Sequence, residues 1–202
     1  MAENASIRLF VAVFPPAHVV TSLQRAVAGL AMGLPARAIR WTRPEQVHLT
    51  LNFLGAIAVA RIPEIESALV AACHGHRQHK VRVAGLGCFP NGRRPQILWA
   101  GLAGDLRPLE SLKKTVDAHL LAIGCVGEER PFHPHLTIGR ARELNAAGRK
   151  QVAEALAREQ ERDFGEWQVG RIDLMQSVLS PQGAVYGMVK SILLENTGGE
   201  NV

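Results

Sequence analysis

The chain has 202 residues, of which 47% are hydrophobic and 20% are charged. This composition is typical of an ordinary globular protein and argues against an intrinsically disordered one, and the length predicts one large domain or two small lobes. The net charge of +5 suits a phosphate-bearing partner but does not require one.

No apolar run approaches the ~18 residues that a membrane span needs, so we expect no membrane association. The first residues show no basic region leading into a long apolar segment, which argues against a secretory signal. The three cysteines, Cys73, Cys88 and Cys125, are far apart and form no Cys-x-x-Cys pair. We therefore expect a cytoplasmic protein without a disulfide framework or a structural zinc site.

Apolar periodicity predicts alternating strands and helices in the first half of the chain. Residues 7–14 form an apolar, β-branched run ended by two prolines, which predicts a buried strand. Apolar residues at three- and four-residue spacing over 17–30 predict an amphipathic helix. The next elements are expected as a short extended piece at 39–41, a strand at 47–54 closed by Gly55, a helix at 62–73, and strands at 80–86 and 96–102.

The second half of the chain predicts two more helices, at 106–123 and at 145–159, and Asn145 is a suitable N-cap for the second. Strands are expected at 132–139, 164–174, 176–179 and 184–194. Residues 196–202 are polar and contain glycine, which predicts a flexible tail.

The order of strands and helices recurs in looser form in the second half. This predicts an α+β fold with two pseudo-symmetric lobes, each an antiparallel or mixed sheet with flanking helices, and an active-site cleft between them. No linker or low-complexity segment separates the lobes, so residues 1–195 are expected to form a single bilobal domain.

The main functional signal is a pair of His-x-Thr segments. Side chains at positions i and i+2 of a strand point to the same face, so His48 shares a face with Thr50, and His135 with Thr137. The apolar residues between and after them point to the opposite face. If the two strands lie side by side in a cleft, two imidazoles and two hydroxyls converge on a space suited to a phosphate.

Two histidines supply what the hydrolysis of a cyclic phosphodiester needs. A neutral imidazole can take a proton from the attacking water, and a protonated one can give a proton to the departing ribose oxygen. Threonine hydroxyls can donate hydrogen bonds to the non-bridging phosphate oxygens. A single His-x-Thr segment is weak evidence, because threonine favours strands and a lone histidine is usually structural, but two matching copies favour catalysis.

Other candidate residues have simpler explanations. Cys73, His74, His76 and His79 could suggest a metal site, but a polar helix terminus is the better interpretation, and we expect no metal. His133 is separated from His135 by a proline and is expected to support it. Trp41 could stack on a base or belong to the core, and helical His18 and His119 are expected to be structural. The remaining candidates are arginines that could contact an RNA backbone: Arg93, Arg94, Arg130, Arg140 and Arg142.

The segments around the two motifs resemble a known family. HLTLNFLG at 48–55 and RPFHPHLTIGR at 130–140 are similar to the paired HxTx motifs of the two-histidine (2H) phosphoesterase superfamily, in particular the bacterial and archaeal RNA 2′,3′-cyclic phosphodiesterases, also called the 2′-5′ RNA ligase family. RLFVAV at 8–13, LMQSVLS at 174–180 and the last strand with Tyr186 are also similar. The chain departs from the family pattern after Tyr186, which leaves substrate contacts there open.

The resemblance implies metal-independent hydrolysis of a terminal RNA 2′,3′-cyclic phosphate to a 2′-phosphate, without a cofactor. By analogy, His48 is the proton donor, His135 is the proton acceptor, and Arg140 contacts the phosphate. The residues alone leave the two histidine roles exchangeable. The expected partner is RNA with a cyclic phosphate end, tRNA fragments included, bound by a monomer.

Two other functions compete with hydrolysis. The same acid and base could join RNA ends reversibly through a 2′-5′ bond, although the abundance of water and the lack of a nucleotide-binding loop favour hydrolysis. The chain could also be an RNA-binding module without turnover. The paired histidines and threonines argue against that function, because binding alone does not need two titrating groups.

Overall fold

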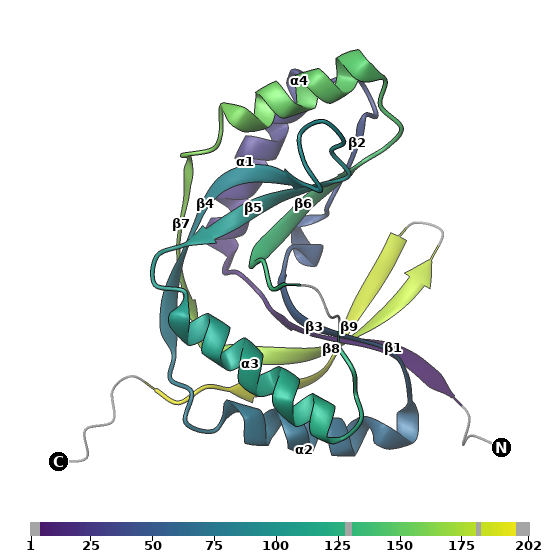
Figure 1. Ribbon diagram of the computed structural model, residues 1–202, viewed down its shortest axis with the longest axis vertical. Helices are drawn as coiled ribbons and strands as arrows, with labels where there is room; N and C mark the ends of the chain where they lie inside the picture. The colour runs from purple at the N-terminus through teal and green to yellow at the C-terminus, as the bar shows by residue number, and fades with distance from the viewer. Residues whose placement is uncertain (1–4, 128–130, 181–182, 197–202) are drawn as a thin grey trace.

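The computed structural model describes residues 5–127, 131–180 and 183–196, which fold into a curved, two-lobed α+β structure (Figure 1). Its strands are β1 (Ser6–Val13), β2 (Ile39–Trp41), β3 (Leu49–Ala58), β4 (His79–Phe89), β5 (Ile97–Ala103), β6 (His135–Ala141), β7 (Asp163–Val169), β8 (Arg171–Ser180) and β9 (Gly183–Leu193). Its α-helices are α1 (Ala17–Met32), α2 (Ile62–Cys73), α3 (Arg107–Ala122) and α4 (Ala146–Ala157), and short 3-10 helices lie at Pro44–Gln46 and Val59–Arg61.

The strands form one sheet in the order β7-β4-β5-β6-β3-β1-β8-β9, and β2 pairs with β6. All of these pairings are antiparallel. Strands β3 and β6 meet through a single residue pair, Leu49 with Leu136, whereas the other neighbouring strands pair over longer stretches. The sheet is therefore two halves joined at one point, and that point lies between the two His-x-Thr segments.

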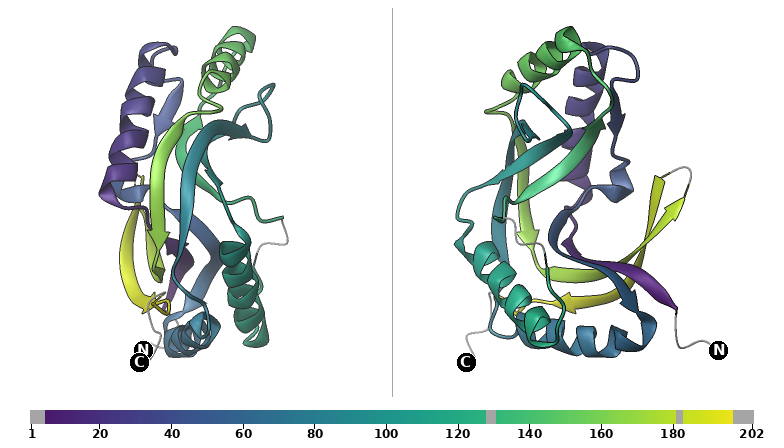
Figure 2. Two further views of the ribbon diagram at one scale, coloured as in Figure 1. Left: turned by 90° about the vertical axis from the view of Figure 1, so that its left-hand side faces the viewer. Right: turned by 45° about the vertical axis from the view of Figure 1, so that its right-hand side comes forward.

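We call the two halves lobe A and lobe B. Lobe A contains β1, β3, β8 and β9, with α2 and α3 packed on each other and against β9 and β3. Lobe B contains β2, β4, β5, β6 and β7, with α1 against β7 and α4 against β4. The two lobes lie at opposite ends of the molecule in Figure 1, and both views of Figure 2 show the same separation.

The predicted α+β, two-lobed architecture is confirmed, but the lobes are not successive halves of the chain. Lobe A takes its strands from both ends of the sequence and its helices from the middle. The recurrence of strands and helices along the sequence could not show this, because it carries no information about which strands pair.

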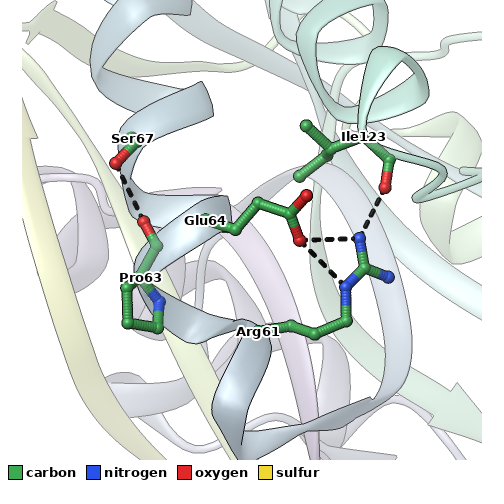
Figure 3. Close-up of polar contacts among 5 residues, drawn as sticks. All are labelled: Arg61, Pro63, Glu64, Ser67 and Ile123. Carbon is green, nitrogen blue, oxygen red and sulfur yellow. Dashed lines mark hydrogen bonds and ion pairs between the residues drawn. The ribbon is translucent and has the colours of Figure 1, made fainter.

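Apolar side chains from both lobes form one continuous core. Leu49 and Leu136, at the junction, are almost completely buried in this core. The histidine and threonine of each motif, on the opposite face of the strand, therefore point toward the cleft. On the outer side of lobe A, the Arg61 guanidinium donates to the Ile123 carbonyl and contacts the Glu64 carboxylate (Figure 3). This contact ties the start of α2 to the end of α3.

Several predicted boundaries are wrong for identifiable reasons. β3 does not end at Gly55: that glycine has a φ of 72°, and the strand continues to Ala58 after an irregular step opposite Leu9. The expected strand 164–174 is broken at Gly170, between β7 and β8. The second motif strand begins at His135 and not at residue 132, and His48 immediately precedes β3.

The N-cap predicted for α4 is confirmed, because the Asn145 carboxamide oxygen accepts a hydrogen bond from the Gly148 N–H at 2.8 Å. Of the expected tail, only Asn196 is described, and it accepts a hydrogen bond from Gln78; residues 197–202 lie outside the described part of the chain. No helix in the described residues is long and apolar enough to cross a membrane.

Candidate active site

Each motif strand has a β-bulge directly after its threonine. Opposite β3, Ala12 pairs with Thr50 and Val11 pairs with Asn52, so the residue between them is extra. Opposite β6, Trp99 pairs with Thr137 and Leu98 with Gly139, again leaving one residue extra. Without a bulge, the residues two and four positions after the threonine would share its face. The extra residue shifts this alternation by one, so the residue three positions after the threonine faces the cleft.

This shift explains how the chain places Arg140 beside Thr137. Simple alternation would put residues 137 and 139 on one face and Arg140 on the other. With the bulge, Thr137 and Arg140 pair with Trp99 and Ile97, which are two apart on β5 and share a face. The equivalent residue in the first motif strand is Phe53, which faces the cleft three positions after Thr50.

The two histidines are held by the same contact. His48 Nδ1 lies 2.7 Å from the Gln46 carbonyl oxygen, and His135 Nδ1 lies 2.6 Å from the His133 carbonyl oxygen. Because a carbonyl can only accept a hydrogen bond, Nδ1 must carry the hydrogen in both rings. In the neutral imidazole this makes Nε2 the acceptor, so Nε2 is the atom that can exchange a proton with a substrate.

Aromatic rings pack around both imidazoles. The centroid of the His48 ring lies 5.0 Å from that of Phe10, 5.6 Å from that of Phe14 and 5.3 Å from that of Tyr186. The rings of His48 and Tyr186 are nearly perpendicular. The His135 ring lies 5.0 Å from Phe89, also nearly perpendicular. The packing restricts how each ring can turn.

The histidines and threonines meet across the junction of the two lobes. Leu49, between His48 and Thr50, pairs with Leu136, between His135 and Thr137, so the two His-x-Thr segments lie beside each other at the junction. The histidines are also close enough that a charge on His135 lowers the pKa of His48.

A cavity of about 740 Å³ brings together four of the five predicted site residues: His48, Thr50, Thr137 and Arg140. His135 lines a separate cavity of about 690 Å³, with Phe89 and Trp99, and the two cavities have no described lining residue in common. Trp41 is half-buried, packs against the core and lines the first cavity, so it combines the two roles considered for it.

The first cavity is strongly basic. Arg8, Arg40, Arg43 and Arg140 line it, and its lining, taken over the described residues, contains no aspartate or glutamate. Arg40 and Arg140 are direct partners in the β2–β6 pairing, so two guanidinium groups project from adjacent strands. An anion in this cavity would be stabilised by the surrounding positive charge.

Burial lowers the pKa of both histidines. For His48 the largest cause is burial, which the hydrogen bond to the Gln46 carbonyl partly offsets. For His135 burial again dominates, the His133 carbonyl offsets it, and the positive charges of His133 and Arg140 lower the pKa further. The lowered pKa favours the neutral form of both imidazoles at pH 7.

Several cavity residues were missed by the sequence reasoning. Arg8 and Phe10 were treated as part of a buried strand, although alternation puts both on one face of β1, and Phe14, which packs on His48, follows directly after that strand. Gln46 gave no signal, yet its carbonyl holds His48 and its side chain donates to the Ala184 carbonyl of β9. Alternation could have identified the first group, whereas the contacts of Gln46 depend on the tertiary structure.

The other candidates lie apart from the cavity around His48. Arg93 lines a separate groove beside α4, and Arg130 lies outside the described residues. The His76 ring is hydrogen-bonded to Thr115 and His79 to the Arg77 carbonyl. Within the described ranges, no group of three or more His, Cys, Asp or Glu residues is placed to hold a metal ion.

An α+β protein with two lobes, paired His-x-Thr strands at their junction and a basic cavity beside them has the architecture of a phosphoesterase. The chain belongs to the LigT-like phosphoesterase family, whose model matches residues 13–99 and 103–186. Each matched segment contains one of the two His-x-Thr motifs.

Relatives from two bacteria and one solved structure show the extent of the similarity. The RNA 2′,3′-cyclic phosphodiesterase of Aquifex aeolicus is 32% identical over 156 residues, which cover 77% of this chain and 81% of the relative. The protein of the same name from Thermus thermophilus is 31% identical over 198 residues, covering 96% and 93%. The crystal structure of TT0787, also from Thermus thermophilus, matches with a TM-score of 0.73 and 29% identity, covering 95% of this chain and 100% of that one.

Proposed function

We propose that the chain hydrolyses the 2′,3′-cyclic phosphate at the end of an RNA to a 2′-phosphate, with His48 as the proton donor and His135 as the proton acceptor. The observation that carries the proposal is the matched presentation of the two imidazoles. Each has Nδ1 hydrogen-bonded to the carbonyl two residues earlier, which leaves Nε2 for proton transfer, and each ring lies next to the residue pair at which β3 and β6 meet.

In the proposed reaction, His135 Nε2 takes a proton from water as the water oxygen forms a bond to phosphorus. The bond from phosphorus to the ribose 3′ oxygen breaks, and protonated His48 gives its Nε2 proton to that oxygen. Thr50 and Thr137 donate hydrogen bonds to the non-bridging oxygens, where negative charge increases in the transition state. Arg140 stabilises the same charge.

The lowered pKa of His135 fits this scheme, whereas the lowered pKa of His48 has to be offset by the substrate. A neutral His135 is the form that can accept a proton, and burial keeps it neutral. His48 must be protonated to act as an acid, and the negative charge of a bound cyclic phosphate raises its pKa toward that form. The side chains of the protein handle every proton in these steps, so the proposed reaction uses no metal.

The names of the relatives support the substrate. The Aquifex and Thermus proteins are RNA 2′,3′-cyclic phosphodiesterases, and both alignments extend over most of this chain. The basic cavity fits the phosphate of an RNA end, tRNA fragments included. Hydrolysis needs only one copy of the site, so we propose that a monomer is active.

The test is an assay with an RNA oligonucleotide that ends in a 2′,3′-cyclic phosphate, carried out in the presence of a chelator. We expect conversion to a 2′-phosphate at an unchanged rate, and no conversion by the double variant His48→Ala/His135→Ala. Loss of activity on chelation would contradict the metal-independent mechanism. A 3′-phosphate product would contradict the assigned bond cleavage, and joining of RNA ends as the favoured direction would identify a ligase.

A further inference from the structure

A groove runs along α4 from the neighbourhood of His135 to the β4–β5 loop. It consists of the cavity of about 690 Å³ that contains His135 and a second cavity of about 770 Å³, and Gly92 and Ala153 line both. The α4 residues in its wall are spaced by three or four positions, so one face of the helix forms that wall: Ala146, Arg149, Lys150, Ala153, Leu156 and Ala157.

The section of the α4 groove beside His135 is apolar and aromatic. The Trp99 indole lies against the β4 backbone, because a Cβ added at Gly87 would come within 2.3 Å of the ring. Phe89 packs on Trp99 at a ring distance of 5.4 Å and on His135 at 5.0 Å. Flat aromatic surfaces of this kind stack on nucleobases without regard to sequence.

The far section of the α4 groove is cationic. Arg93, from the β4–β5 loop, faces Arg149 and Lys150 of α4 across it. The Arg149 guanidinium donates to the Leu144 carbonyl at 2.8 Å, and the Lys150 ammonium lies 3.8 Å from the Glu154 carboxylate. The backbone N–H of Arg93 donates to the Asn91 carboxamide oxygen, which orders the loop. Among the described residues that line either section, none carries a carboxylate.

A constriction separates the two sections. The position of a Cβ on Gly92 would lie 3.3 Å from the Ala153 methyl group, so the loop and the helix approach closely there because both residues are small. The order along the groove is therefore a titrating histidine, an aromatic surface and a set of cationic side chains. A nucleic-acid strand presents the same order: a reacting phosphate, a base and further phosphates.

We infer that the α4 groove binds the single-stranded RNA that adjoins the reacting end. Bases stack in the section beside His135, and backbone phosphates lie against Arg93, Arg149 and Lys150. The inference rests on the proposed function, since it extends the substrate from the cyclic phosphate to the strand that carries it. It predicts that the enzyme distinguishes an oligonucleotide from a mononucleotide.

The test compares a mononucleoside 2′,3′-cyclic phosphate with an RNA of about ten nucleotides that has the same end, a length within the range of single-strand binding sites. For the wild-type chain we expect KM for the oligonucleotide to be lower by about tenfold or more, because it adds phosphate contacts. The variant Arg93→Glu/Lys150→Glu should raise the oligonucleotide KM by about tenfold and leave the mononucleotide kinetics unchanged.

The matched control is Arg25→Glu/Lys114→Glu, which makes the same charge change at exposed residues of α1 and α3 outside the groove. In the groove variant only, the plot of log KM for the oligonucleotide against log salt concentration should become shallower. The slope should fall by about 0.7 for each phosphate contact removed. Equal KM values for the two substrates in the wild-type chain, or equal effects of the two variants, would overturn the inference. Failure of the wild-type chain to hydrolyse even the mononucleotide would reject the proposed function instead.

Discussion

The two histidines are held alike but surrounded differently. Both donate Nδ1 to the carbonyl two residues earlier, and both lie beside the single junction of the lobes. His48, however, packs against three aromatic rings in lobe A, whereas His135 packs against Phe89 and lies near His133 and Arg140. The repeated motif therefore sets the position of each imidazole, and the surroundings from different strands set its protonation.

The two motif strands also differ at the position three residues after each threonine, where the backbone is alike but the side chain is not. The bulge turns Phe53 toward the cleft in one motif strand and Arg140 in the other. The backbone is duplicated, but one copy presents a ring and the other presents a charge. The asymmetry of the site thus lies in side chains placed on equivalent backbone positions.

The largest expected effect comes from removing either histidine. His48→Ala and His135→Ala should each lower kcat by about 10²–10⁴-fold, because each removes one proton transfer. In the pH profile of kcat, His48→Ala should abolish the alkaline limb and His135→Ala the acid limb. Measuring both profiles on folded protein, checked by circular dichroism, tests the comparison directly.

The alternative outcomes are distinct. If the limbs are lost in the opposite order, the acid and base roles are exchanged while the two-histidine mechanism stands. If one variant keeps full activity, that histidine is not part of the reaction.

A smaller effect is expected at the two positions after the bulges. Arg140→Gln should raise KM for the cyclic phosphate by about tenfold or more, since it removes a charged hydrogen-bond donor from an anion. Phe53→Gln, its matched counterpart, should change KM by less than about threefold, because the ring supplies no charge. Steady-state kinetics on both variants measure the difference, and equal effects would show that Arg140 does not contact the phosphate.

Much of this site could be predicted from local sequence. The spacing of histidine and threonine requires only an extended backbone to put both on one face, and the apolar residues beside them require only a core. The α+β class followed from hydrophobic periodicity, which is also a local property. These features were correct because each depends on residues within a few positions.

The features that were missed depend on distant pairing. The β-bulges follow from the register of β3 with β1 and of β6 with β5, and only that register places Phe53 and Arg140 in the cleft. The interleaving of lobe A from both chain ends is likewise a matter of which strands pair. No pattern within one segment specifies a partner far away in sequence, so the bulges, Phe53 and the interleaving required the structure, whereas Arg140 was expected only from the family resemblance.

The smallest expected effect is on stability and follows from the lowered histidine pKa values. An unfolded histidine titrates near ~6.5, and both His48 and His135 titrate lower in the folded chain, chiefly because of burial. Below pH ~6.5 the unfolded chain therefore binds protons that the folded chain does not, which lowers the free energy of unfolding. Above that pH the effect is absent.

The loss is at most about 1.4 kcal/mol per histidine for each pH unit, because that is the free energy of one proton per unit. Urea unfolding of the wild-type chain and of the variant His48→Gln/His135→Gln, each at pH 7.5 and 5.5, isolates the contribution of the two histidines. All other groups titrate equally in the two proteins. We expect the free energy of unfolding to fall less in the variant. Inorganic phosphate should reduce the fall in the wild-type chain, because an anion bound in the basic cavity raises the pKa of both imidazoles, and an identical fall in both proteins would contradict the lowered pKa values.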